Sequence, residues 1–278
     1  MSPPPVTADA VATAAERLLS ARSCGVPCAP VRDLIGRDDV RAAYAVQQLL
    51  TGARVAGGGR VVGRKIGLTS AAVQAQLGVS QPDFGVLFDD MRFPDGALVP
   101  AGSVLQPRAE AEIAFVLKED LVEGDLSPAQ VRGAIDHAVA AIEICGSRIE
   151  DWDISFADTV ADNASGGAFV LGQDRMDLGG FAPRDAVMSL RIDGAEVSTG
   201  TGADCMGDPL AAVRWLARQA REWGEPLRAG QVILSGALGP MRPVRPGNTV
   251  QATVAPLGTV TFTLGTAATP GTPGGAAR

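Results

Sequence analysis

From Arg60 onward, the chain consists of short apolar segments that are separated by Gly, Pro and Asp. Such interruptions allow strands of about four to eight residues but break long helices. The segments that favour strands are 61–66, 111–117, 231–234, 249–254 and 259–264. Strands and helices do not follow one another in a regular βαβ order, so the sequence favours an α+β fold over a doubly wound sheet. The last two strands, joined across Leu257-Gly258, are expected to form a hairpin.

The N-terminal part of the chain has helical patterns instead. Thr7 is a typical N-cap for a first helix, and a second helix is expected to begin near Asp39 and to end at the glycine triplet that starts at Gly57. The C-terminal end has almost nothing to bury, which predicts disorder. The predicted divisions are a helical N-terminal segment at 1–59, a β-rich domain at 60–265 and a disordered tail at 266–278.

Two further helices are predicted inside the β-rich domain. A capping box that begins at Ser127, with proline at the first helical position, predicts a helix to about Val139. Asp208, which is also followed by proline, opens a second helix that ends at Gly224.

The charge and the cysteines exclude several classes of function. The net charge is −7, from 24 Lys+Arg against 31 Asp+Glu, and this argues against nucleic acid or an anionic membrane as a partner. No apolar run approaches the ~20 residues of a membrane span, and no signal peptide is visible. Four cysteines without a C-x-x-C pair, together with a single histidine, argue against a zinc site. We expect a cytoplasmic protein with reduced thiols.

Two acidic side chains share one face of the segment 106–117. Because side chains alternate along a strand, Ala111 and Ile113 face the core, and Glu110 and Glu112 point to the opposite side, about 7 Å apart. Two such carboxylates repel each other unless a positive charge lies between them. Mg²⁺ or Mn²⁺ would supply that charge, because these ions prefer carboxylate oxygens. A solvated strand face with two surface glutamates explains the spacing equally well.

A third acid, Glu143, interrupts an otherwise apolar segment at 140–145. A carboxylate in such a segment is costly to bury unless it is paired or bound to a metal. Arg148 is the alternative partner. Cys145 lies next to the same position, where its thiol can approach a metal, although a buried cysteine usually acts as a small hydrophobic residue.

Five motifs occur in a fixed order along the chain. They are Gly63-Arg64-Lys65-Ile66-Gly67-Leu68-Thr69-Ser70, Gln81-Pro82-Asp83-Phe84-Gly85, the Glu110/Glu112 strand, Ser147-Arg148-Ile149-Glu150-Asp151-Trp152 and Ala161-Asp162-Asn163-Ala164-Ser165. This set resembles the 2-keto-4-pentenoate hydratase family, which belongs to the fumarylacetoacetate hydrolase superfamily. The resemblance runs from about residue 43 to residue 264 and includes the segment 235–240.

The resemblance implies a fold and a metal centre. The fold is a mixed β-roll or sandwich with a small helical N-terminal part, and members of the family form homo-oligomers. The metal is Mg²⁺ or Mn²⁺, and its ligands fall on Glu110, Glu112 and Glu143.

The resemblance also implies residues that act on the substrate. The catalytic positions fall on Lys65, Asp83 and Ser165. The substrate contacts fall on Leu68, Gly236 and Leu238. The glycines of this last segment can let backbone N–H groups approach a substrate carboxylate, or they can serve a turn. His137 matches no site of the family, and we interpret it as structural.

The implied activity is hydration of a small 2-oxo or 2-hydroxydienoic acid, such as 2-hydroxypenta-2,4-dienoate, which gives 4-hydroxy-2-oxopentanoate. The alternatives are decarboxylation of 4-oxalocrotonate (2-oxohex-3-enedioate), hydrolysis of an acylpyruvate, and a non-catalytic partner subunit. A decarboxylase has to bind a second carboxylate, for which Arg148 or Arg242 offers a cation. The segments 147–152 and 236–240 resemble the hydratase branch more closely, so we expect hydration.

Overall fold

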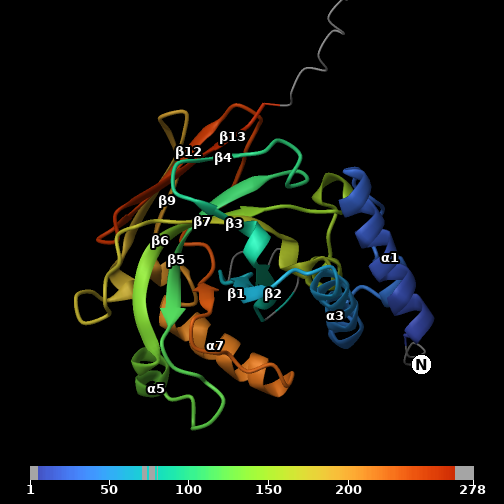
Figure 1. Ribbon diagram of the computed structural model, residues 1–278, viewed down its shortest axis with the longest axis horizontal. Helices are drawn as coiled ribbons and strands as arrows, with labels where there is room; N and C mark the ends of the chain where they lie inside the picture. Colours follow the sequence, from blue (N-terminus) through green and yellow to red (C-terminus); the bar gives the residue numbers. More distant parts are fainter. Residues whose placement is uncertain (1–5, 71–73, 75–78, 80, 267–278) are drawn as a thin grey trace, which may run out of the picture.

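The computed structural model describes residues 6–70, 74, 79 and 81–266. Figure 1 shows a β-rich body with the N-terminal helices packed along one side. The predicted α+β class, with a mixed β core and a small helical N-terminal part, is confirmed. None of the helices in the described ranges is long and apolar enough to cross a membrane. The predicted disordered tail lies outside the described residues, apart from Thr266.

The strands form two sheets. Their bounds are β1 (Val61–Gly67), β2 (Asp83–Phe88), β3 (Arg92–Pro94), β4 (Ala97–Val99), β5 (Arg108–Leu117), β6 (Ile135–Cys145), β7 (Gly166–Leu171), β8 (Val187–Ile192), β9 (Ala195–Thr201), β10 (Val232–Leu234), β11 (Arg242–Pro243), β12 (Thr249–Ala255) and β13 (Thr259–Leu264). The larger sheet has the order β2-β1-β10-β5-β6-β7-β3, with β11 paired to β5, and the smaller sheet has the order β4-β13-β12-β8-β9. Both sheets mix parallel and antiparallel pairs. The predicted hairpin is confirmed in β12 and β13.

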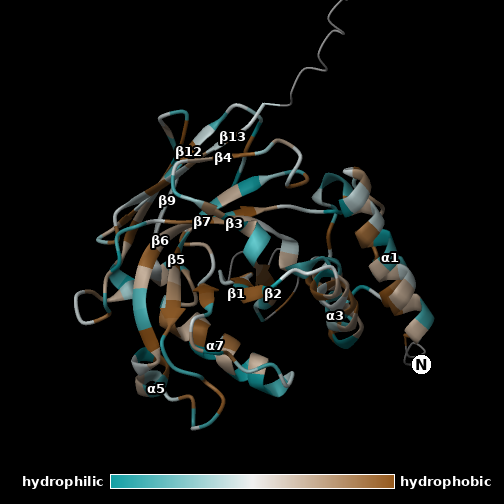
Figure 2. Cartoon of the chain, in the orientation of Figure 1, coloured by the Kyte–Doolittle hydropathy of each residue, from teal (hydrophilic) through white to brown (hydrophobic). Residues whose placement is uncertain are grey.

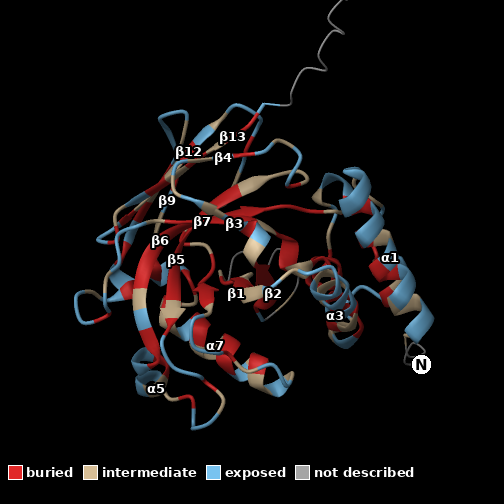
Figure 3. Ribbon diagram, viewed as in Figure 1, coloured by how far each residue is buried: buried red, intermediate tan, exposed pale blue. Residues whose placement is uncertain are grey.

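The strands β5 and β6 lie at the centre of the larger sheet, and β12 and β13 pack against them. Both central strands are buried along most of their length (Figure 3). Alternate residues of β5 enter different hydrophobic clusters: Ile113 and Phe115 join the main core, and Ala114 joins a second cluster with residues of β2, β7 and β10. Figure 2 shows the same concentration of apolar residues along these strands. The side of β5 that carries Ala114 also carries Glu110 and Glu112.

Most of the described helices begin at capping side chains. Their bounds are α1 (Ala8–Cys24), α2 (Arg32–Ile35), α3 (Val40–Ala56), α5 (Pro128–Gly133), α6 (Phe156–Ala161) and α7 (Pro209–Glu222), with 3-10 turns η1 (Asp89–Met91), η2 (Glu150–Trp152), η3 (Asn163–Ser165), η4 (Pro183–Asp185) and η5 (Gly202–Asp204). The predicted N-caps are confirmed: Thr7, Asp39 and Asp208 each accept a hydrogen bond from a backbone N–H of the first turn. Each side chain thereby satisfies a donor that has no partner inside the helix.

The helix predicted from Ser127 to about Val139 is wrong in its extent. Ser127 does cap α5, but the helix ends at Gly133, and β6 begins at Ile135. The residues from Ala138 onward form an unbroken buried run that pairs with β5 and β7 on its two edges. Pairing in the centre of a sheet therefore overrides the local helical pattern. His137 consequently lies on a strand.

The helical segment shares its core with the β-rich domain. Leu18 of α1, Val46 of α3 and Ile66 of β1 belong to one hydrophobic cluster. The side-chain amide of Gln47 donates to the carbonyls of Phe84 and Val160, which ties α3 to β2 and α6. The predicted division after residue 59 is therefore a change of secondary structure within one continuous core.

A buried carboxylate also holds the helical segment in place. Asp158 of α6 is fully buried, and its Oδ1 accepts from the backbone N–H groups of Val31 and Arg32 at 2.9 and 2.8 Å. Its Oδ2 accepts from Ser155 and from the guanidinium of Arg32. The outer side of the same guanidinium pairs with Asp153, whose side chain is 67% exposed.

We predict that Asp158→Asn lowers the free energy of unfolding by about 3 kcal/mol, because the change removes the buried charge that accepts from Arg32 and from three neighbouring donors and turns an amide N–H toward some of them. Asp153→Asn is the matched control, because it removes an exposed partner of Arg32 and should cost at most about 1 kcal/mol. Urea unfolding followed by tryptophan fluorescence measures both values. Equal destabilisation by the two variants would contradict the assigned role of Asp158.

Candidate active site and metal centre

Three glutamates face one another across two neighbouring strands. Glu110 and Glu112 lie on the same face of β5, and Glu143 of β6 is the direct cross-strand partner of Glu110. The exposed fraction is 0% for Glu112 and Glu143 and 9% for Glu110. The interpretation of Glu110 and Glu112 as a solvated strand face is therefore wrong. All three predicted ligands lie together in the interior.

The arginine proposed as the alternative partner of Glu143 pairs elsewhere. Arg148 donates from its backbone N–H and from its guanidinium to the buried carboxylate of Asp162. Glu143 instead faces Lys65, whose Nζ lies 3.3 Å from Glu143 Oε1. The buried ammonium of Lys65 therefore lies beside a group of three buried carboxylates.

Several oxygens of this group lack hydrogen-bond partners. Within the described residues, neither oxygen of Glu143 and only one oxygen of Glu112 accepts a hydrogen bond. Burial raises the pKa of Glu112 well above its usual range, and the charges of Glu143 and Glu110 raise it further. Burial also raises the pKa of Glu143 to about 7, although the nearby Lys65 opposes this shift. A divalent cation between the carboxylates would remove the unfavourable charge repulsion, so these residues fit a hard metal ion.

The closest group of donor atoms differs slightly from the predicted ligand set. Among the described residues, Glu110, Glu143 and Cys145 each offer a ligand atom, and these atoms all lie within 4.8 Å of one another. Glu112 lies two residues from Glu110 on the same strand face, and burial and the charge of Glu143 raise its pKa. The ligand set of Glu110, Glu112 and Glu143 stays a prediction.

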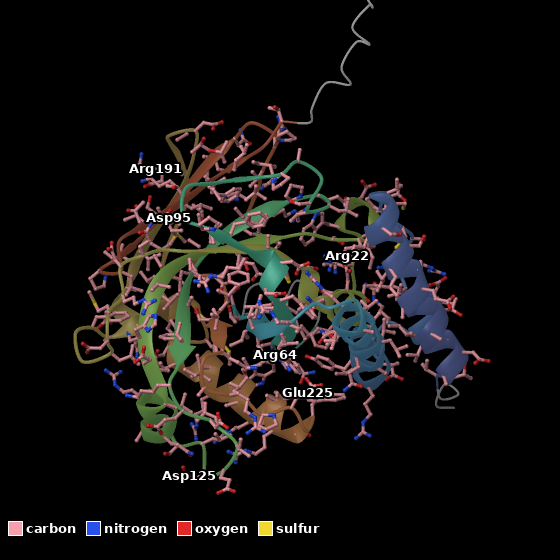
Figure 4. The ribbon with its side chains drawn as sticks, viewed as in Figure 1. Arg22, Arg64, Asp95, Asp125, Arg191 and Glu225 are labelled. Carbon is pink, nitrogen blue, oxygen red and sulfur yellow. The ribbon has the colours of Figure 1, made fainter. Side chains whose placement is uncertain are left out.

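The strand β1 directs two cations to opposite sides. Arg64 points away from the site and pairs with Glu225, which follows α7 (Figure 4). Lys65 points inward and is 2% exposed, and its Nζ donates to the carbonyl of Ala164 at 2.9 Å. Both orientations follow from the alternation of side chains along a strand.

The ammonium of Lys65 is held in its charged form by its neighbours. Burial by itself lowers the pKa of this lysine, but the charges of Glu143, Asp83 and Glu110 outweigh burial and raise the pKa well above its usual value. Lys65 is therefore a fixed positive charge at the site.

A strained turn supplies the carbonyl that Lys65 contacts. Asn163, Ala164 and Ser165 all have left-handed backbone conformations, with φ values of 54°, 50° and 55°. Each such residue costs about 1–3 kcal/mol, so the surrounding structure has to hold it in place. The Asn163 side chain does so by exchanging hydrogen bonds of 2.8 and 3.0 Å with the backbone of Val86. A Cβ at Gly85 would overlap the Asn163 carbonyl, which explains the glycine.

Asp83 and Ser165 are linked through a hydroxyl that the sequence analysis missed. Thr159 Oγ1 lies 3.4 Å from Asp83 Oδ2 and 3.1 Å from Ser165 Oγ. Burial raises the pKa of Asp83, opposed by the charge of Lys65 and by Thr159. A Cβ at Gly67 would overlap Asp83 Oδ1, so the motif glycine lets this carboxylate approach β1. No local pattern identifies Thr159, because α6 is short and its contact depends on β2 lying beside it.

The three predicted substrate contacts have different positions. Leu68 lines the cavity described below. The backbone N–H of Gly236 donates to Glu112 Oε2 at 2.7 Å, so this glycine positions a carboxylate. Leu238 is fully buried in the hydrophobic core, and its N–H donates to the carbonyl of Ala111. Gly236 and Leu238 are not among the residues that line the cavity, whereas Ala237 and Gly239 are, and direct substrate contacts through the first two stay a prediction.

A cavity of about 1260 Å³ opens onto these residues. The predicted site residues on its wall are Lys65, Leu68, Asp83, Glu110 and Ser165. Glu112 and Glu143 lie beneath this wall, so a small molecule in the cavity reaches the carboxylate group past Glu110 and Cys145. The cavity can therefore hold an anionic ligand that shares a cation with the carboxylates.

The cations on the cavity wall differ from the predicted ones. Arg148 is occupied by Asp162, and Arg242 Nε donates to the carbonyl of Val197, so the expectation that either serves the far end of the cavity is wrong. Arg37 and Arg108 line the cavity instead. The guanidinium of Arg108 stacks 4.3 Å from the ring centre of Trp152. Strand alternation would have identified Arg108, because it lies two residues before Glu110.

The family is shown by comparison with known proteins. The family model described as fumarylacetoacetate (FAA) hydrolase C-terminal matches residues 61–265. The "TodF product hydratase" of Pseudomonas putida strain F1 is 53% identical over 252 residues, which cover 91% of this chain and 94% of that protein. The "2-keto-4-pentenoate hydratase" of Paraburkholderia xenovorans strain LB400 is 51% identical over 247 residues, or 89% and 92% of the two chains.

A solved structure agrees with this relationship. The 4-oxalocrotonate decarboxylase from Pseudomonas putida G7, complexed with magnesium and adipate, has a TM-score of 0.88 and 32% sequence identity to this chain. The match covers 93% of this chain and 98% of that one. Taken with the carboxylate group and the five motifs, these likenesses show that the chain belongs to the 2-keto-4-pentenoate hydratase family of the fumarylacetoacetate hydrolase superfamily.

Proposed function

We propose that this protein is a divalent-cation-dependent hydratase that adds water to 2-hydroxypenta-2,4-dienoate and gives 4-hydroxy-2-oxopentanoate. The observation that carries the proposal is the buried group of Glu110, Glu112 and Glu143, whose unpartnered oxygens lie beneath a cavity lined by Lys65 and Asp83. Relatives of about half-identical sequence that bear hydratase names support the choice of reaction.

The cation that fits the site is Mg²⁺ or Mn²⁺. Carboxylate oxygens are the ligands that both ions prefer, and the magnesium complex of the similar decarboxylase supports the assignment. Glu110, Glu112 and Glu143 would hold the ion. When bound, it supplies Lewis-acid polarisation of the 2-oxo group of a chelating 2-oxo acid.

Two further residues stabilise charge and transfer protons: Lys65 does the first and Asp83 the second. Ketonisation of the dienol moves a proton from the 2-hydroxyl group to C5, and hydration then adds hydroxide at C4 and a proton at C3. Lys65 stabilises the negative charge that develops on the substrate oxygen, because its ammonium is fixed by Glu143 and by the Ala164 carbonyl. Asp83, whose pKa is raised by burial, exchanges the protons, and Thr159 and Ser165 orient its carboxylate.

The alternatives differ in how well the cavity suits them. Hydrolysis of an acylpyruvate generally uses a histidine, and His137 lies on β6 with Nδ1 2.7 Å from Asp136, outside the residues that line the cavity. Decarboxylation of a dioic acid is the second candidate, because Arg37 and Arg108 place cations on the cavity wall. The homo-oligomer and the cytoplasmic location remain predictions.

Glu112→Gln should lower the affinity for Mg²⁺ and Mn²⁺ by about 100-fold or more, because it replaces a charged ligand by a neutral amide of the same shape. Titration calorimetry on chelator-treated protein measures the affinity. Glu119→Gln is the control, because Glu119 is an exposed glutamate just beyond the end of β5. Unchanged affinity in the single glutamine variants of Glu110, Glu112 and Glu143 would show that the ion binds elsewhere.

Lys65→Met should reduce kcat by about 100-fold or more, because a side chain of similar length then carries no charge. With saturating Mg²⁺, which compensates for the carboxylates, the variant should still unfold cooperatively and bind the metal. Lys118→Met is the control, because Lys118 is exposed at the far end of β5. A variant that keeps the parent rate, or one that cannot fold with metal present, would assign Lys65 a structural role.

The reaction itself is tested with two substrates. We expect kcat/KM for hydration of 2-hydroxypenta-2,4-dienoate to exceed kcat/KM for CO₂ release from 2-oxohex-3-enedioate, because the half-identical relatives are hydratases. The products are identified by mass spectrometry, with protein treated with a chelator as the control. Faster CO₂ release from the dioic acid would favour the decarboxylase function and a carboxylate-binding role for Arg108.

A further inference from the structure

A thiol lies among the carboxylates of the candidate metal centre. Cys145 is two residues after Glu143 on β6, so both side chains point to the same face of the sheet. Its Sγ lies 3.5 Å from Glu110 Oε1, and the residue is 4% exposed on the cavity wall. Cys145 thereby completes the group in which three donor atoms lie within 4.8 Å of one another.

The surroundings of Cys145 differ from those of a structural cysteine. Cys205 is fully buried in the main hydrophobic core and donates to the carbonyl of Ser235. Cys145 belongs to neither of the hydrophobic clusters of the described residues, and its thiol donates to the carboxylate of Glu110. Its position beside a buried carboxylate, outside both clusters, indicates that the thiol has a role other than filling space.

The distance between Cys145 Sγ and Glu110 Oε1 is compatible with two ligands on one ion. With metal–sulfur and metal–oxygen bonds of about 2.3 and 2.1 Å, two neighbouring donors lie about 3.1–3.6 Å apart, and donors on opposite sides lie about 4.4 Å apart. The 3.5 Å between Cys145 Sγ and Glu110 Oε1 falls in the first range. The third donor, Glu143, is fully buried, and neither of its oxygens accepts a hydrogen bond within the described chain.

We propose that Cys145 Sγ is a further ligand of this metal centre, which lets the site bind thiophilic divalent cations such as Co²⁺, Zn²⁺ or Cd²⁺ through sulfur. The inference rests on the proposed function, because it uses the same carboxylates. On binding, the S–H proton leaves to solvent and a metal–sulfur bond replaces it. The ammonium of Lys65 offsets part of the added negative charge. Hard Mg²⁺ has little affinity for sulfur, so with Mg²⁺ the thiol stays protonated and donates to Glu110.

The test is anaerobic titration of the chelator-treated, full-length protein with CoCl₂, followed by absorption spectroscopy. We expect the visible bands of bound Co²⁺ together with a near-ultraviolet sulfur-to-cobalt charge-transfer band. Cys145→Ser should lose the charge-transfer band and keep the visible bands. It should also bind Cd²⁺ about tenfold or more weakly, with Mg²⁺ affinity changed by less than about twofold. Cys205→Ser, which alters a buried thiol in the core, and the double variant Cys24→Ser/Cys28→Ser should keep the band.

The outcomes separate this inference from the proposed function. Visible Co²⁺ bands without a charge-transfer band in the parent protein would overturn sulfur ligation and leave the carboxylate site intact, and this result needs no variant to fold. A charge-transfer band that persists in Cys145→Ser would assign the sulfur to another cysteine and overturn the inference. If neither Co²⁺ nor Mg²⁺ binds the parent protein, the proposed metal centre is wrong, and the proposed ligation by Cys145 is wrong as well.

Discussion

The structure depends on the burial of three carboxylates, Glu110, Glu112 and Glu143, around one ammonium, that of Lys65. Charges of one sign in an interior of low dielectric constant repel each other, and their desolvation is costly. A sheet tolerates them because the backbones of β5 and β6 are held by hydrogen bonds on both edges, so the strands cannot move apart to relieve the repulsion. A cation bound between the carboxylates would offset this repulsion.

The residues around this group keep the charges at fixed positions. Gly236 donates to Glu112, and its own conformation, with φ at 103°, is one that a glycine adopts without strain. Gly67 leaves space for Asp83, and the left-handed turn at Ala164 directs a carbonyl to Lys65. The glycines and the strained turn therefore position the charged groups. They occur in the same sequence motifs as the charged residues for this reason.

The two ends of a substrate in the cavity have different requirements. Chelation of a 2-oxo acid by a cation on the carboxylates is common to hydration and decarboxylation, so the metal centre does not decide between them. The far wall does, because a dioic acid needs a cation there and a monoacid does not. In this chain Arg37 and Arg108 place cations on the cavity wall, and Arg108 stacks on Trp152. Cys145, the direct cross-strand partner of Arg108, lies beside Glu110 on the same cavity wall.

Local features of the sequence determined the helix caps at Thr7 and Asp39, the two faces of β5 and the family, because each depends on a few consecutive residues. Alternation along β5 was also sufficient to place Glu110 and Glu112 together. Only the tertiary structure decided that the chain after Gly133 is a strand, because its partners β5 and β7 come from distant segments. It also decided that Glu143 faces Lys65 and not Arg148, since β10 joins β1 to β5 in one sheet. The pairing of buried charges follows the order of strands in the sheet, and no local pattern encodes that order.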